Sequence, residues 1–72
     1  MDTIEVIKNG YEIVIKITKN IANNGMIEAD AYYKDFDFYK ILVIADSTDK
    51  AVKLATQELL MNHPFEKVIR EN

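Results

Sequence analysis

The residues that could carry chemistry in this chain are few and scattered. His63 is the only histidine, Ser47 is the only serine, and cysteine is absent. A zinc site needs several imidazole or thiolate ligands, and a nucleophilic serine needs a base and an orienting group beside it. We interpret Ser47 as the N-cap of a predicted helix and His63, just before Pro64, as exposed or bound to helix C-terminal carbonyls. We therefore expect no catalytic residue and no metal site.

Four carboxylates are the remaining candidates for acid–base work or for a hard cation: Glu28, Asp30, Asp35 and Asp37. Glu28 and Asp30 are two residues apart on a predicted strand, so they share one face. Calcium and magnesium need several converging oxygens, and glycoside hydrolysis needs a cleft, so an alternating solvated face explains these acids more simply. Both glycines follow asparagine in turn motifs rather than in a phosphate-binding loop, so we expect no cofactor.

Lys16, Tyr32 and Lys40 form an aromatic and basic row on the predicted open face of the sheet. Sheets that bind single-stranded nucleic acid stack bases on such rings and hold phosphates with such lysines. Acids share this face, however, and the whole chain has twelve acids against nine bases, for a net charge of -3. Because phosphate neutralisation carries most nucleic-acid affinity, nucleic-acid binding is the alternative function here.

The composition is that of an ordinary folded chain. Its 72 residues are 49% hydrophobic and 29% charged, with two glycines and one proline. We expect a single small domain over residues 1–72. The absence of cysteine suits a reducing compartment, the first residues lack the regions of a signal peptide, and the longest apolar run, residues 41–45, is too short to span a bilayer. We therefore expect an unprocessed, soluble, cytoplasmic protein that does not act at a membrane.

Two strand patterns, over residues 3–8 and 11–22, flank Asn9 and Gly10, the pair that suits both positive-φ positions of a type I′ turn. A two-residue loop there sets the flanking residues opposite each other. The alternating isoleucines of the second strand then form one apolar face, and a slip of one residue would turn that face to solvent.

Residues 23–25 predict a three-residue turn that leads into a third strand over residues 26–34. This turn keeps apolar residues opposite apolar residues on the inner face. The predicted pairs are Ala22 with Met26, Ile21 with Ile27, Ile17 with Ala31 and Ile15 with Tyr33. Alanines in the inner row leave space for a helix.

Residues 35–37 predict a second three-residue turn, followed by a fourth strand over residues 38–45. A two-residue turn would bury Lys40, so we favour three. The predicted pairs are Tyr33 with Tyr39, Ala31 with Ile41 and Ala29 with Val43. The outward side chains of this strand are then Phe38, Lys40, Leu42 and Ile44, and three of the four are apolar.

The apolar spacing from Ala51 to Leu59 predicts a helix over residues 48–62, which Pro64 ends. Residues 65–70 could form a short fifth strand or a turn over the core. The fold class is therefore α+β: an antiparallel four-stranded meander with one helix packed on one face, and a possible short C-terminal strand.

The fourth strand is an edge strand that is apolar on both faces, and such edges are normally covered or used. Residues 65–70 could pair with it, or another chain could, which includes a homodimer. The third alternative is that these outward apolar residues are ordinary scattered surface residues without a function. We predict a small acidic protein-binding module, not an enzyme, that suits an inhibitor or adaptor of the kind made by mobile elements to block a host protein. The predicted partner-binding residues are Tyr32, Asp35, Phe36, Asp37, Phe38, Leu42 and Ile44.

Overall fold

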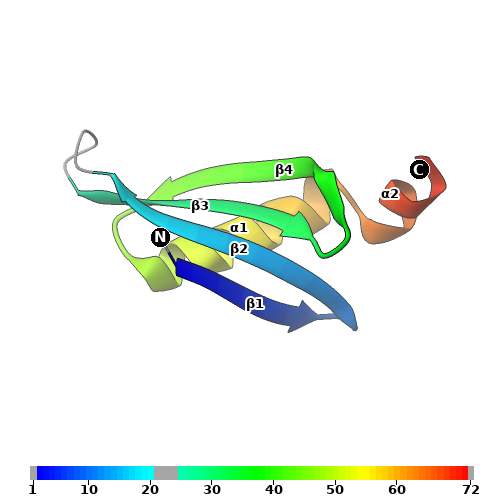
Figure 1. Ribbon diagram of the computed structural model, residues 1–72, viewed down its shortest axis with the longest axis horizontal. Coiled ribbons are helices and arrows are strands. Elements are labelled where there is room, and N and C mark those ends of the chain that lie inside the picture. The colour runs from blue at the N-terminus through cyan, green and yellow to red at the C-terminus, as the bar shows by residue number, and fades with distance from the viewer. Residues whose placement is uncertain (1, 21–24, 72) are drawn as a thin grey trace.

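The computed structural model describes residues 2–20 and 25–71, and it confirms the predicted α+β meander (Figure 1). The strands pair in sequence order, and the first helix packs on one face of the sheet. The elements are β1 (Asp2–Lys8), β2 (Tyr11–Asn20), β3 (Met26–Tyr33), β4 (Phe36–Ala45), α1 (Thr48–Asn62) and α2 (Phe65–Glu71).

The β1–β2 hairpin has the predicted turn and the predicted register. Asn9 and Gly10 have φ angles of 55° and 82°, and Lys8 pairs with Tyr11. Positive φ at both positions matches the right-handed twist of the flanking strands. The isoleucines of β2 that the pattern places inward, Ile13, Ile15 and Ile17, are buried.

The predicted register between β2 and β3 is wrong by two residues. Ile17 pairs with Ala29 rather than Ala31, and Met26 pairs with Asn20. The other predicted pairs involved Ile21 and Ala22, and these residues lie outside the described part of the chain together with Asn23 and Asn24. A shift of two residues leaves every side chain on its predicted face, so the apolar alternation could not separate the two registers. Gly25 does have the left-handed φ expected of it, 76°.

The predicted turn between β3 and β4 is also wrong. The turn has two residues, Lys34 and Asp35, and Tyr33 pairs with Phe36 instead of Tyr39. An irregularity in β4 then takes up the extra residues, so that Ala31 meets Ile41 as predicted. This bulge removes the objection to a short turn, because it keeps Lys40 exposed.

Helix α1 has the predicted bounds and the predicted N-cap. The Ser47 side chain accepts a hydrogen bond from the Lys50 backbone N–H, at 3.3 Å. The buried side of the helix packs on β3 and β4, where the small inner side chains of β3 allow a close approach. The side chains buried at this contact include Ala29, Ala31, Ala51, Ala55 and Leu59.

The predicted fifth strand is wrong, because the residues after Pro64 form helix α2. The Pro64 carbonyl accepts hydrogen bonds from the backbone N–H groups of Lys67, at 2.9 Å, and Val68, at 3.1 Å. Pro64 is therefore the N-cap residue of α2, whose carbonyl accepts the first hydrogen bonds of the helix. Val68 is buried, and its spacing from Phe65 places both on one helical face.

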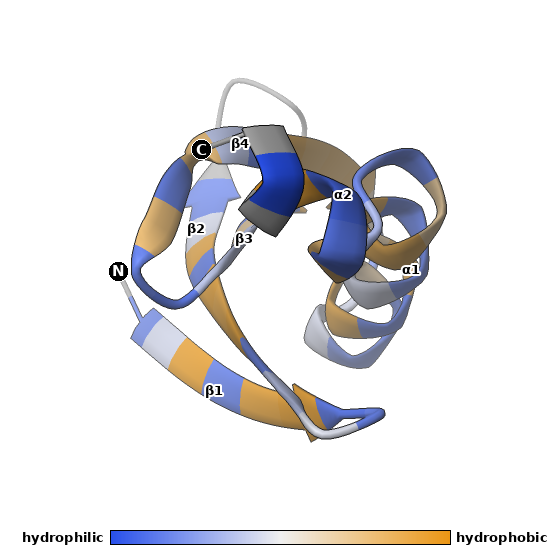
Figure 2. Cartoon of the chain, turned by 90° about the vertical axis from the view of Figure 1, so that its right-hand side faces the viewer, coloured by the Kyte–Doolittle hydropathy of each residue, from blue (hydrophilic) through white to orange (hydrophobic). Residues whose placement is uncertain are grey.

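Seen end-on, the sheet curves, and α1 lies against the β3 and β4 side while β1 curls away (Figure 2). The two strands at the edges, β1 and β4, therefore have different support. The inner side chains of β1, Ile4 and Val6, are only partly buried at the margin of the core.

Candidate protein-binding surface

β4 is an edge strand, and α2 does not cover it. The order β1-β2-β3-β4 leaves no strand on its outer side within the residues that the structure describes. The side of β4 that does not pair with β3 therefore presents alternating backbone N–H and C=O groups. An edge of this kind is a template for another strand.

The outer face of β4 carries large apolar side chains that the fold leaves exposed. The exposed fractions are 51% for Phe38, 62% for Leu42 and 47% for Ile44, which confirms the predicted outward orientation. Leu42 lies opposite Asp30 and Ile44 opposite Glu28 on β3. Because these neighbours are acidic, β3 offers the two aliphatic side chains no apolar cover.

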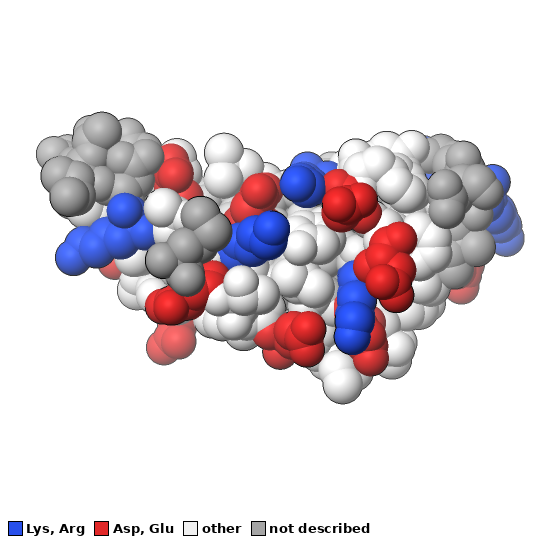
Figure 3. Space-filling view, viewed as in Figure 1, with Lys and Arg blue, Asp and Glu red and all other residues white. Residues whose placement is uncertain are grey.

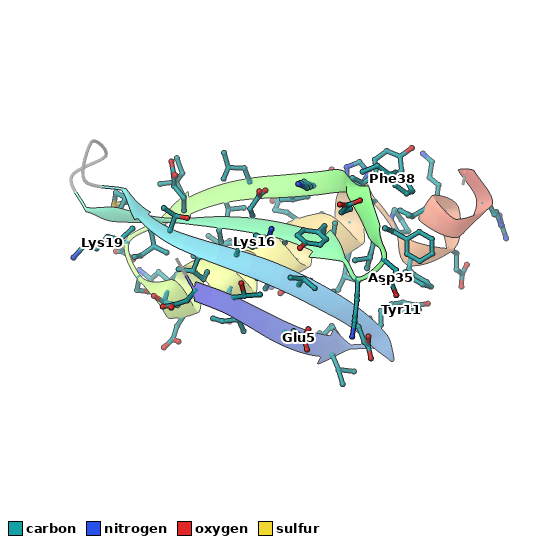
Figure 4. The ribbon with its side chains drawn as sticks, viewed as in Figure 1. Glu5, Tyr11, Lys16, Lys19, Asp35 and Phe38 are labelled. Carbon is teal, nitrogen blue, oxygen red and sulfur yellow. The ribbon has the colours of Figure 1, made fainter. Side chains whose placement is uncertain are left out.

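The turn before β4 is supported by α2. Asp35 adopts a positive φ of 70°, and both Asp35 and Asp37 are exposed. Phe36 is half-buried, and its ring centroid lies 5.7 Å from that of Phe65. The Phe38 ring continues this aromatic group, 6.2 Å from Phe36, and remains exposed at the start of β4 (Figure 4).

Phe36 thus packs the start of β4 against α2, and the ring of Phe38 stays open to solvent. The sequence reasoning missed the role of Phe65, whose ring also stacks on Tyr11 at 4.5 Å and meets Tyr33 at 5.1 Å. A signal for it was present, because an aromatic residue directly after Pro64 is well placed to begin the apolar side of a helix.

His63 packs against β4 rather than standing exposed. Its ring stacks on that of Tyr39, with centroids 4.8 Å apart, and it is half-buried. Its backbone N–H donates to the Leu59 carbonyl, at 2.9 Å. The imidazole therefore holds the end of α1 against the first half of β4.

Tyr32 is half-buried on the outer face, and two lysine ammonium groups lie near its ring. The Nζ atoms of Lys16 and Lys40 lie 5.7 Å and 5.5 Å from the centre of its ring. The predicted strand row is wrong, since Lys16 pairs with Asp30 and Val14 pairs with Tyr32. The long lysine side chains bring the three groups together nevertheless, as cation–π contacts.

Acidic and basic side chains are interspersed over this outer face (Figure 3). A small hollow of about 130 Å³ is lined by Lys16, Thr18, Glu28, Asp30 and Leu42. Pockets that enclose small molecules are usually about 300 Å³ or larger. Within the described ranges, no three His, Cys, Asp or Glu side chains are grouped as metal ligands would be.

Tyr33 is the one described residue with a buried side-chain polar atom that lacks a hydrogen-bond partner. Its ring packs against the rings of Tyr11 and Phe65. Burial raises the pKa of the Tyr33 hydroxyl above its ordinary value, and the nearby Tyr11 raises it further. This hydroxyl lies on the covered face of the sheet, away from the outer face of β4.

Comparisons with protein-family models, with curated proteins and with solved structures find no match for this chain. None of the helices in the described part is long and apolar enough to cross a membrane. The functional argument therefore rests on the geometry of the surface itself.

Proposed function

We propose that this chain is a small, acidic, non-enzymatic protein-binding module, and that its partner occupies β4 and the adjoining turn. The proposal rests on the contrast between the two faces of β4. Its inner side chains pack against the core, yet its outer face exposes Phe38, Leu42 and Ile44 along an unpaired edge. A stable strand held in this way is ready to accept a further strand.

Such a strand binds by extending the sheet. Backbone hydrogen bonds along β4 supply affinity, and alternate side chains supply specificity. Full burial of a leucine or isoleucine contributes about 1.5–3 kcal/mol, so Leu42 and Ile44 would dominate the contact together with the Phe38 ring. Asp35, Asp37 and the half-buried Tyr32 and Phe36 would line its polar and aromatic end.

A module of this kind suits an inhibitor or adaptor, including one that a mobile element makes to block a host protein. This role rests on the small size of the chain, its net charge of -3 and the lack of a catalytic cluster in its sequence. A chain without cysteine also suits the cytoplasm, where thiols and disulfides are kept reduced.

The test is to place a charge on the outer face of β4. We expect Leu42→Lys and Ile44→Lys to remove partner binding or self-association, while circular dichroism and urea unfolding report an intact fold. Both side chains are exposed, so the substitutions leave the core unchanged. Ile7→Lys is the matched control, because Ile7 is 73% exposed on the other edge strand.

The measurement compares cross-linked pull-downs and sedimentation of these variants with the wild type. Proteins recovered by the wild type and by Ile7→Lys, but not by either β4 variant, would support the proposal. A monomeric wild type whose pull-down recovers the same proteins as both β4 variants would overturn it.

The second candidate function is single-stranded nucleic-acid binding on the outer face. It is favoured by one observation, the placement of both the Lys16 and Lys40 ammonium groups within 5.7 Å of the Tyr32 ring centre. Glu28 and Asp30 on the same face weaken it by repelling phosphates. The test is titration with RNA and DNA of mixed sequence at low salt. If no binding is detected at low salt, this function is eliminated.

A further inference from the structure

We propose that the strand that pairs with β4 is β4 of a second copy of this chain, antiparallel across a two-fold axis at Val43. This inference rests on the proposed function, because it takes β4 as the protein-binding edge and names its partner. The result would be a continuous sheet of two meanders, with α1 of both copies on the same side.

The argument begins with the symmetry of residues 40–46, Lys-Ile-Leu-Val-Ile-Ala-Asp. In an antiparallel pair with Val43 opposite its own copy, residues equally distant from Val43 meet. Leu42 then lies opposite Ile44 of the other copy, and the next outer-face residue, Lys40, comes opposite Asp46, which directly follows β4. Because of the two-fold axis, each of these contacts forms twice.

The outer-face side chains in this pairing are all exposed in the single chain. Leu42 and Ile44 from both copies would form one apolar cluster on the outer face, and Lys40 and Asp46 are exposed at its two ends. Opposite charges directly across two strands are favourable, and like charges are unfavourable. The apolar centre of one copy therefore meets the apolar centre of the other, and each charged end meets the opposite charge.

Lys40 and Asp46 have other neighbours within the chain, and both contacts are open to solvent or long. The Asp46 carboxylate accepts from the Lys50 ammonium, with a nitrogen–oxygen distance of 3.2 Å and exposed fractions of 61% and 66%. The Lys40 ammonium lies 5.5 Å from the Tyr32 ring centre. Neither contact buries the charge that the second copy would meet.

The neighbouring registers lack this complementarity. An axis at Leu42 would set Lys40 opposite Ile44, an axis at Ile41 would set Lys40 opposite Leu42, and an axis at Ile44 would set Asp46 opposite Leu42. An axis between two residues would pair an outward side chain with an inward one, which two-fold symmetry through a sheet does not allow. Val43 is thus the centre that the charges select.

The test is a charge exchange across the proposed pair, measured by sedimentation velocity over a concentration series. We expect the wild type to dimerise. Lys40→Glu places a second carboxylate opposite Asp46, and Asp46→Lys places a second ammonium opposite Lys40, so each should raise the dissociation constant roughly tenfold or more. An equimolar mixture should form a heterodimer, and the double variant Lys40→Glu/Asp46→Lys should regain the homodimer.

The double variant also controls for folding, since it carries both substitutions and should still associate. As a second measurement, Val43→Cys should form an intermolecular disulfide on mild oxidation, because residues directly opposite in antiparallel strands lie about 4.5–5.5 Å apart. The chain has no other cysteine. Ile7→Cys, on the other edge, should still dimerise through β4 but should form no intermolecular disulfide under the same conditions.

A monomeric wild type would overturn the inference, as would single variants that dimerise like the wild type or a mixture that forms no heterodimer. These failures are distinct from failure of the proposed function. If the wild type is monomeric, and its pull-down recovers a protein that Leu42→Lys does not bind, then the homodimer is excluded. In that case a different protein occupies β4, and the proposed function stands.

Discussion

β1 and β4 are the two edge strands of one sheet, and they differ in the outer-face side chains that self-pairing would bring together. Glu5 lies at the centre of β1, whereas Leu42 and Ile44 lie on either side of Val43 in the second half of β4. Antiparallel self-pairing of β1 around Glu5 would bring Lys8 opposite Asp2, but it would also set Glu5 opposite its own copy. We therefore expect the Glu5 carboxylate to disfavour self-pairing of β1, whereas the proposed pairing of β4 sets no charge opposite its own copy.

The edges also differ in what lies beneath them. α1 packs on β3 and β4, and β1 curls away from it (Figure 2). β4 is therefore held in the conformation that a partner strand needs, so less conformational entropy is lost on binding. The comparison teaches that the edge best supported by the core is also the one whose proposed self-pairing brings no like charges together.

The largest expected effect comes from removing the support of β4. Leu59 is fully buried on α1, so Leu59→Ala should lower the free energy of unfolding by about 2–5 kcal/mol, through lost burial and the cavity left behind. Urea unfolding measures it. Val6→Ala on the partly buried inner side of β1 is the matched control and should cost less, and an equal loss for the two variants would break the comparison.

A smaller effect is expected from removing the protection of β1. Glu5→Leu should strengthen self-association through β1 by roughly tenfold, or about 1.4 kcal/mol, relative to the chain with Glu5. The reason is that apolar contact replaces the two like charges that face each other across the axis. Sedimentation should be measured in a Leu42→Lys background, so that β4 contributes nothing. Glu5→Lys retains a like-charge pair and should stay monomeric. If Glu5→Leu is equally monomeric, charge is not what protects β1.

The smallest effect at neutral pH is expected at Tyr33, which lies on β3 between the edges. Tyr33→Phe should change stability by about 1 kcal/mol or less, in the stabilising direction, since it removes a buried hydroxyl without a partner. Urea unfolding of both proteins measures this, and sedimentation should find the association of both edges unchanged. A loss of several kcal/mol would show that the hydroxyl has a partner.

The same substitution should alter stability at alkaline pH. Because burial raises the pKa of Tyr33 in the folded state, the unfolded chain loses this proton at a lower pH than the folded chain, so the free energy of unfolding falls as the pH rises from the ordinary value of 10.0 through the folded-state pKa. Unfolding free energies measured from neutral pH to above pH 10 should therefore fall less steeply for Tyr33→Phe. Parallel curves for the two proteins would contradict the role of burial.

Much of the fold could be predicted because local rules determine it. Asn9 and Gly10 set the first hairpin and its register through their positive φ angles. Ser47 and Pro64 bound α1, and the alternation of apolar residues assigns the faces of the strands. The outward orientation of Leu42 and Ile44 follows from the same alternation, so the central residues of the candidate surface were available from the sequence.

The remainder depended on contacts between distant residues. The alternation of apolar residues cannot distinguish registers of β2 and β3 that differ by two residues, and it does not predict the bulge in β4. Both depend on which inner side chains pack together. Phe36 packs against Phe65, which lies far along the chain and folds back as part of α2. The sequence alone determined which side chains of β4 face outward, and only the tertiary structure decided that α2 leaves its edge open, because covering an edge requires elements that meet only in the folded chain.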